Sequence, residues 1–264
     1  MKYLSILLIL ASFGINFSQD TTYRTLPNNA FSYGERLSYE VSYSFLTAAE
    51  AFINISPSPV AINGRETYEV NFDVNSRSSF DMVYKVRDNY KTYIDTKGIF
   101  PWKYEQHIRE QKYKRDYEQY YLPDSNKVNT IGNYTEKRTF EAPAYVQDIL
   151  SSLYYIRTLD LKNAKEGDVF TFEVFNDDKH YPMKVRIMGR EDVDVSAGEF
   201  KTLVVKPEIS EGFTSKTSDL FVYLSDDDRK IPVKVKMNII IGALTGELTE
   251  YSGLNGPLNS KIDD

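Results

Sequence analysis

The sequence predicts an all-β protein, an antiparallel barrel or half-barrel made from two similar β-meanders that one central α-helix joins. Three observations predict this class. Apolar and polar side chains alternate over several short stretches, turn-forming residues separate these stretches, and one segment in the middle of the chain has the spacing of a helix instead.

The alternating stretches are the predicted strands. The pattern is clearest near the C-terminal end, where single polar residues separate Val233, Val235 and Met237. Because successive side chains of a strand point to opposite faces, each strand is expected to bury one face. Other stretches lie at 36–45, 68–75 and 170–174, and turn signals fall at Asn63-Gly64, Lys97-Gly98, Glu166-Gly167-Asp168, Ala197-Gly198 and Asp226-Asp227-Asp228.

The one helical segment is predicted over residues 144–158. Its apolar residues recur at spacings of three and four, which places them on one face of a helix. Pro143 suits the first helical position, Asp148 lies early and Arg157 lies in the last turn, as the helix dipole favours. The apolar face consists of Val146, Ile149, Leu150, Leu153 and Ile156.

The two halves of the chain, 31–142 and 159–253, resemble each other. Gly34–Val41 opens the first half and Gly167–Val174 opens the second, each with a Gly-acid turn before an alternating strand. Further on, the interval from Asp88 to Pro101 has the same length as the interval from Asp219 to Pro232. This pattern predicts a duplicated meander of roughly five strands, with one strand count and one pairing order. The alternative is that turns look alike because few residue types form them.

The N-terminus predicts export. Lys2 precedes an apolar run that ends at Phe17, and Ser18 is a small residue suited to a cleavage site. We therefore expect a signal peptide at 1–18, a disordered lead at 19–30, a single β-rich domain at 31–253 and a flexible tail at 254–264. The alternatives for the apolar run are an uncleaved anchor or a buried segment. No later stretch is apolar for long enough to span a membrane, so the expected location is periplasmic or secreted.

Composition narrows the function classes. The chain has 32 basic and 38 acidic residues, a net charge of −6, which is a poor match for nucleic acid and argues against docking on anionic lipid head groups. It has no cysteine, so disulfides, thiol catalysis and thiolate metal sites are all absent. Stability must therefore come from core burial.

Several motifs together resemble a bacterial family known as domain of unknown function 3108. They are Phe31-x-x-Gly34-Glu35-x-Leu37-x-Tyr39, the run Asp148–Arg157, Ala197-Gly198-Glu199-Phe200, and Leu224-Ser225-Asp226-Asp227 before Ile231-Pro232-Val233. The resemblance covers roughly residues 31–250, and the helix motif is its most specific part. Where the family often has Trp before the Ser-Asp pair, this chain has Tyr223-Leu224. The resemblance implies an exported envelope protein with a barrel-like fold, and it implies no reaction.

Residues suited to catalysis or metal binding are few. The chain has only two histidines, His107 and His180, and no Gly-x-Ser-x-Gly nucleophile motif, and two histidines without cysteine do not make a zinc site. Asp226–Asp228 lacks the spacing of a calcium loop, and Glu35 lacks an identified partner carboxylate for glycosidase chemistry. We therefore expect no catalytic residues, no metal, no cofactor and no enzymatic activity.

The segment from Trp102 to Tyr121 is the predicted ligand-binding region. Tyrosine, Arg and Gln share one strand face there, with no aliphatic residue among them. Tyrosine rings offer apolar area while their hydroxyl groups find polar partners, which suits a cleft for an amphipathic or sugar-like ligand. The alternative is a hairpin exposed to solvent. The predicted site residues are Trp102, Tyr113, Arg115, Tyr117 and Tyr121.

Three functions are compatible with these features. The favoured one is a non-catalytic periplasmic binding or carrier protein for a lipid-like or glycan ligand, held in the mouth of the barrel. The second is a structural or assembly partner of other envelope proteins, which would use an exposed sheet edge or aromatic patch. The third is a hydrolase with paired carboxylates in a cleft.

Overall fold

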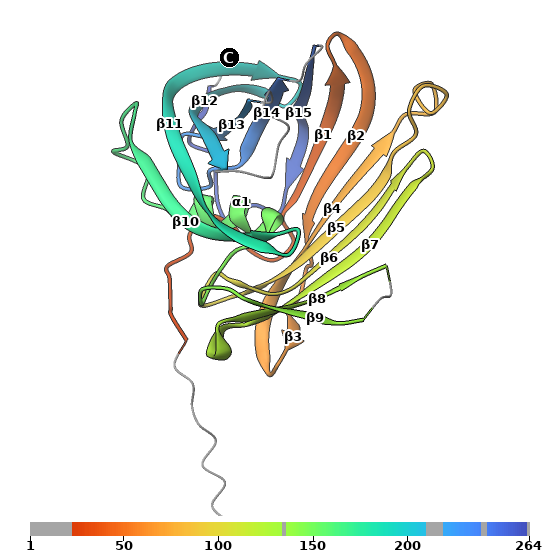
Figure 1. Ribbon diagram of the computed structural model, residues 1–264. Helices are drawn as coiled ribbons and strands as arrows, with labels where there is room; N and C mark the ends of the chain where they lie inside the picture. Colours follow the sequence, from red (N-terminus) through yellow and green to blue (C-terminus); the bar gives the residue numbers. More distant parts are fainter. Residues whose placement is uncertain (1–22, 134–135, 210–218, 239–241, 263–264) are drawn as a thin grey trace, which may run out of the picture.

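A single antiparallel sheet of 16 strands makes up most of the molecule (Figure 1). The computed structural model describes residues 23–133, 136–209, 219–238 and 242–262. The strands before the helix are β1 Arg36–Tyr43, β2 Leu46–Ile55, β3 Val60–Ile62, β4 Arg65–Ser76, β5 Arg87–Asp95, β6 Pro101–Glu110, β7 Tyr113–Leu122, β8 Lys127–Gly132 and β9 Arg138–Glu141. A 3-10 turn, Pro123–Ser125, joins β7 to β8. Helix α1 follows at Ile149–Thr158.

The strands after the helix belong to the same sheet. They are β10 Val169–Asn176, β11 Lys179–Val195, β12 Gly198–Ile209, β13 Leu220–Ser225, β14 Pro232–Asn238, β15 Ala243–Ser252 and β16 Lys261–Ile262. Along the sheet the order is β10 to β15, then β1, β2 and β4 to β9, with β3 paired to β4 and β16 to β12. The first strand of the chain therefore pairs with β15.

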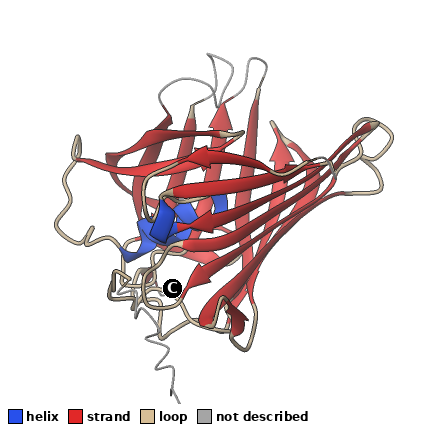
Figure 2. Ribbon diagram, turned by 60° about the horizontal axis from the view of Figure 1, so that its bottom comes forward, coloured by secondary structure: helices blue, strands red, loops and turns tan. Residues whose placement is uncertain are grey.

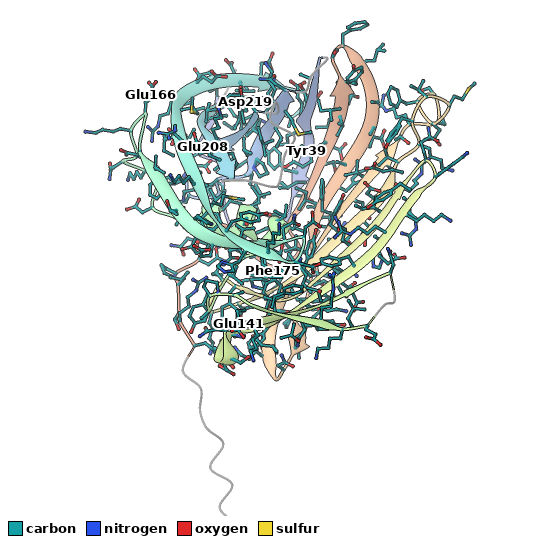
Figure 3. All side chains as sticks on the ribbon, in the orientation of Figure 1. Tyr39, Glu141, Glu166, Phe175, Glu208 and Asp219 are labelled. Carbon is teal, nitrogen blue, oxygen red and sulfur yellow. The ribbon has the colours of Figure 1, made fainter. Side chains whose placement is uncertain are left out.

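The sheet curls around α1 without closing, so the predicted half-barrel is confirmed (Figures 1 and 2). Its two edges, β9 and β10, form no strand ladder with each other among the described residues. Side chains bridge the edges instead. Phe175 of β10, labelled in Figure 3, packs on Phe140 of β9 with ring centroids 5.9 Å apart. Asp178 in the β10–β11 turn accepts hydrogen bonds from Tyr117 (2.8 Å) and Thr130 (2.9 Å) and pairs with Arg138.

The two halves are both antiparallel meanders, but they are unequal. Among the described residues nine strands precede the helix and six, β10–β15, follow it within 159–253, so the prediction of two equal halves of about five strands is wrong. Pairing order agrees over the first five strands of each path, β1-β2-β4-β5-β6 against β10-β11-β12-β13-β14. The first half then adds β7 to β9, which carry the path to its edge beside β10.

The helix is shorter than the predicted range 144–158, and the predicted start at residue 144 is wrong. Asp148 is the N-cap, because its side chain accepts the Ser151 amide (2.7 Å) while the Ser151 hydroxyl accepts the Asp148 amide (2.9 Å). Tyr145 has a left-handed backbone and Gln147 exchanges backbone hydrogen bonds with β10. Pro143 is therefore outside the helix, and Val146 is buried in the core without being helical.

The predicted disordered lead at 19–30 is wrong for residues 23–30, while 19–22 lie outside the described residues. Arg24 donates two hydrogen bonds of 2.7 Å to the carbonyl groups of Gly98 and Ile99, and the Leu26 amide donates to Lys97. The lead is thus fastened to the β5–β6 turn. Its last residues pack into the core.

The predicted flexible tail at 254–264 is also corrected over its described part. Strand β16 pairs with β12, and Leu254 and Leu258 pack against the core. Ser260 is buried and donates through its amide and hydroxyl to Asp227 at 3.0 and 2.7 Å. Tail and lead also meet, since the Asn255 side chain donates to the Asn29 carbonyl at 3.3 Å.

The predicted signal peptide, 1–18, lies outside the described residues. Within the described ranges, no helix combines the length and the apolar character needed to cross a membrane.

Helix α1 is tied to the sheet by a fully buried ion pair. Arg157 donates to both carboxylate oxygens of Glu35, at 2.7 and 2.6 Å, and both side chains have no exposed surface. Arg157 also donates to the carbonyl groups of Ala30 and Arg229, and its guanidinium lies over the Phe31 ring at 5.2 Å. One side chain thus joins the lead, β1, the helix and the β13–β14 turn.

Candidate functional site

A cavity of about 640 Å³ lies between the two halves of the sheet, with α1 as its floor. Its volume falls in the range of small-molecule sites, and its lining is mostly apolar. The lining from the first half is Ile53, Phe72, Val74, Tyr90, Tyr104, Gln106 and Arg115; from α1, Ile149, Leu150, Ser152, Leu153 and Ile156; and from the second half, Asn176, Asp177, Met183, Pro207, Leu220, Val222, Val235 and Met237.

Strand alternation positions the first wall. Phe72 and Val74 are two residues apart on β4 and therefore share its inner face. Phe72 stacks on Tyr90 of β5, with ring centroids 5.7 Å apart and ring planes 26° apart. Tyr104 lies next to them on β6 and is almost fully buried. These rings form a flat apolar surface on one side of the cavity.

The second wall is aliphatic. Leu220 and Val222 alternate on β13, and Val235 and Met237 alternate on β14, so that all four side chains face the cavity. Below them, Leu153 of α1 packs against both hydrophobic clusters of the protein. The helix therefore separates the cavity from the tightly packed base of the barrel.

The polar groups of the lining gather where β7 meets the tip of the β10–β11 hairpin. Arg115 donates to Asp177 at 2.6 Å, and its guanidinium lies 4.5 Å from the centre of the Tyr117 ring. Gln106 and Asn176 line the same region. Asp177 is the one carboxylate among the described lining residues, so the two-carboxylate arrangement of a glycosidase is not present there.

Sequence comparison places this fold in a family. The model of "Protein of unknown function (DUF3108)" matches residues 38–249, which is most of the chain. The chain belongs to the DUF3108 family. The match begins at Ser38, so the opening motif Phe31–Leu37 lies outside the matched range. No curated protein matches the sequence.

Two solved structures are similar to this DUF3108 protein. The crystal structure of a β-barrel-like protein of domain of unknown function DUF1849 from Brucella abortus has a TM-score of 0.58 and 10% identity, over 88% of this chain and 99% of that chain. At this identity the likeness concerns the fold alone. A structure described as "a putative lipoprotein from Parabacteroides distasonis" has a TM-score of 0.35 and 12% identity, over 88% of this chain and 100% of that chain.

Two of the motifs that carry the DUF3108 resemblance meet at α1, and the residues described below have structural roles. Glu35 from the opening motif binds Arg157 from the helix motif. Asp227, in the last motif, accepts hydrogen bonds from the Arg229 and Lys230 amides and from Ser260. Glu35 is therefore half of a buried ion pair, and the loop Asp226–Asp228 is ordered by its own backbone.

The five predicted site residues lie in different places. Arg115 lines the cavity, while Tyr117 and Tyr121 are buried on the same inner face of β7. Tyr117 donates to Asp178 (2.8 Å) across the gap between the sheet edges, and Tyr121 donates to Gln119. Tyr113 is 55% exposed at the start of β7. Trp102 is buried near the lead and donates to Asp95 at 3.1 Å.

Sequence reasoning missed most of the cavity lining. The sequence predicts only core positions for two parts of the lining. These are the aliphatic wall of β13 and β14, and Leu153 on the floor. The alternation of Val235 and Met237 signalled an inward face. The wall opposite β13 and β14 comes from strands more than a hundred positions earlier in the chain. No local pattern in the sequence shows that a space remains between these two walls.

The two histidines are on the outside of the sheet. His107 lies 2.7 Å from Asp116, which also accepts from Arg109, and His180 lies 3.2 Å from Glu173. Neither residue lines the cavity. Both histidines therefore contact a carboxylate at the surface.

Asp148 gives the protein a titratable group beneath the cavity. Burial raises the pKa of its carboxyl from an ordinary value of 3.8 to about 6, while hydrogen bonds from Thr92 (2.6 Å) and Ser151 (2.7 Å) oppose the shift. A folded-state pKa above the unfolded value means that the group stabilises the fold below about pH 4 and that this stabilisation is lost as pH rises through about 6.

The variant Asp148→Asn tests this titration. Asn keeps an N-cap acceptor without a charge, so its stability relative to wild type should increase by about 2–3 kcal/mol as pH rises from about 4 to about 7.5. Urea unfolding at several pH values measures the difference. Asp116→Asn is the control of opposite sign, because hydrogen bonds from His107 and Arg109 lower the pKa of Asp116. A flat pH profile for Asp148→Asn would contradict the assignment.

Proposed function

We propose that this protein is an exported, non-catalytic binding or carrier protein for an apolar or amphipathic molecule of the cell envelope, held in the cavity between the two halves of the sheet. The observation behind the proposal is the cavity itself, about 640 Å³ in volume and lined by aliphatic and aromatic side chains from both walls and the helix. A void of this size in a packed interior is unusual unless a ligand fills it.

The lining favours an acyl chain over a glycan. A sugar ligand would need many hydrogen-bonding side chains around it, whereas the lining from β13 and β14 is apolar and α1 adds one polar residue, Ser152, to its aliphatic ones. The polar residues Gln106, Arg115 and Asp177 lie together at one place in the lining. An amphipathic ligand would place its apolar part over Leu153 and its polar group beside Arg115.

Native mass spectrometry of the protein purified from its own cells tests the proposal. We expect a mass excess that is lost on denaturation and is recovered in an organic extract as an acyl-chain compound. Saturable uptake of cis-parinaric acid, a fluorescent fatty acid, by delipidated protein is the second expected result. A protein that carries no added mass and takes up no probe would overturn the proposal.

The second candidate function is an assembly partner of other envelope proteins. The exposed apolar side chains of Phe45 and Met82, which are 87% and 93% exposed, favour it. Cross-linking in intact cells would distinguish the two, because an assembly partner is expected to form a defined cross-linked product whether or not the cavity is filled.

A further inference from the structure

The hairpin turns at one end of the sheet carry most of the exposed apolar side chains. The turns β1–β2, β4–β5 and β6–β7 lie at the same end of the meander (Figure 1, upper right), opposite the end at which the lead meets the β5–β6 turn. Eight large apolar side chains of the described residues are exposed, and six of them lie in or beside these turns: Phe45, Leu46, Met82, Val83, Tyr84 and Tyr113. We call these six, with Lys85, Lys112 and Lys114, the rim.

Backbone hydrogen bonds order the turns of the rim, so its side chains are not exposed merely because a loop is frayed. The β4–β5 loop is folded into turns in which the Val83 and Tyr84 amides both donate to the Phe80 carbonyl (2.8 and 2.9 Å). The loop is also joined to the neighbouring β6–β7 turn, because Gln111 donates through its amide to Lys85 (2.9 Å) and through its side chain to Val83 (3.0 Å). The apolar side chains are therefore held outward by a fixed backbone.

The charges of the rim are predominantly basic. Lys85, Lys112 and Lys114 are exposed, and none of them forms an ion pair with a described residue. The nearby acids do not cancel this charge: Asp81 pairs with Arg87 (2.7 Å), and Glu110, which accepts a hydrogen bond from Tyr84 (2.7 Å), is one carboxylate against three lysines. The rim is therefore locally positive, although the whole chain has a net charge of −6.

We propose that the rim docks this protein on the surface of an anionic lipid bilayer. Apolar side chains on loop tips enter the head-group region, while lysines beside them are attracted to negative lipid head groups. The net negative charge of the chain argues against docking on anionic lipid. However, a charge more than about 10 Å away is largely screened at physiological salt, so the lysines of the rim determine the attraction to the bilayer. This inference goes beyond ligand binding, because docking does not depend on what the cavity holds.

Co-sedimentation with lipid vesicles tests the proposal, using the chain from Gln19 onward. This chain keeps every described residue and lacks the apolar N-terminal run. We expect binding to vesicles of phosphatidylcholine and phosphatidylglycerol in equal parts, weakening as salt is added, and little binding to pure phosphatidylcholine. K85E/K112E/K114E should reduce partitioning roughly a hundredfold or more, since each lysine contributes about fivefold.

Matched variants separate docking from general effects. K97E/K162E/K165E makes the same charge change at exposed lysines outside the rim and should bind nearly as well as wild type. F45S/M82S/V83S should lower partitioning at least about tenfold while leaving cis-parinaric acid uptake unchanged. Equal losses in the two lysine triples, or no vesicle binding by wild type, would overturn the proposal. A rim-dependent dimer in sedimentation velocity without vesicle binding would overturn it in favour of a second copy of this chain.

Discussion

Arg157→Met is expected to lower the free energy of unfolding by about 3–5 kcal/mol, because it leaves the Glu35 carboxylate buried without its partner. Both side chains have no exposed surface, and two hydrogen bonds of 2.7 and 2.6 Å join them. The loss also releases the lead and the β13–β14 turn, to which Arg157 donates. Urea unfolding followed by circular dichroism measures the effect.

Two further variants test whether the loss of stability comes from the buried charge of Glu35. Arg186→Met removes an ion pair of similar geometry with Glu208, but both partners are about one third exposed, so the expected loss of stability is much smaller than that of Arg157→Met. The double variant Glu35→Gln with Arg157→Met should recover part of the loss, because no buried charge remains. Equal losses for Arg157→Met and Arg186→Met would show that the buried pair has no special role.

Val222→Trp is expected to weaken uptake of cis-parinaric acid by at least about tenfold, or about 1.4 kcal/mol, by filling the cavity from the β13 wall. Val74→Trp should do the same from the opposite wall on β4, since both side chains line the void. Overpacking normally costs stability, but here the added ring enters empty volume, so the melting temperature should change little. Fluorescence titration of delipidated protein measures binding.

Val169→Trp is the matched control for the cavity variants. Val169 is 42% exposed at the start of β10 and does not line the cavity. The same substitution there should leave uptake of the probe unchanged. If all three tryptophan variants bind the probe like wild type, the apolar cavity is not where it binds.

The strands could be predicted because each depends on local alternation. Val233, Val235 and Met237 form an inner face on β14 as their spacing indicates. The start of the helix could not be predicted from spacing, because the N-cap at Asp148 depends on its hydrogen bonds with Ser151. The docked lead was missed for a similar reason, since Arg24 is fixed by carbonyl groups of a distant turn.

The candidate site was predictable only in part. The inward face of β7 was identified from its aromatic and polar composition, and Arg115 does line the cavity. Tyr117 and Tyr121 share that face but are covered by neighbouring elements, including the β10–β11 hairpin tip that Tyr117 reaches. Whether an inner face borders a void or a packed neighbour depends on the distance between walls, and that distance has no local sequence signal.

The pairing of β1 with β15 has a consequence for folding. This ladder joins Arg36 to Ser252 across nearly the whole described chain, whereas every other strand pairs with close neighbours apart from the short β16. Contacts between distant residues form slowly because a long loop must close first. Each meander can therefore assemble locally, and union of the two at β1 and β15 is expected to limit the folding rate. Until then β1 presents an unpaired edge, at which intermolecular strand exchange would begin.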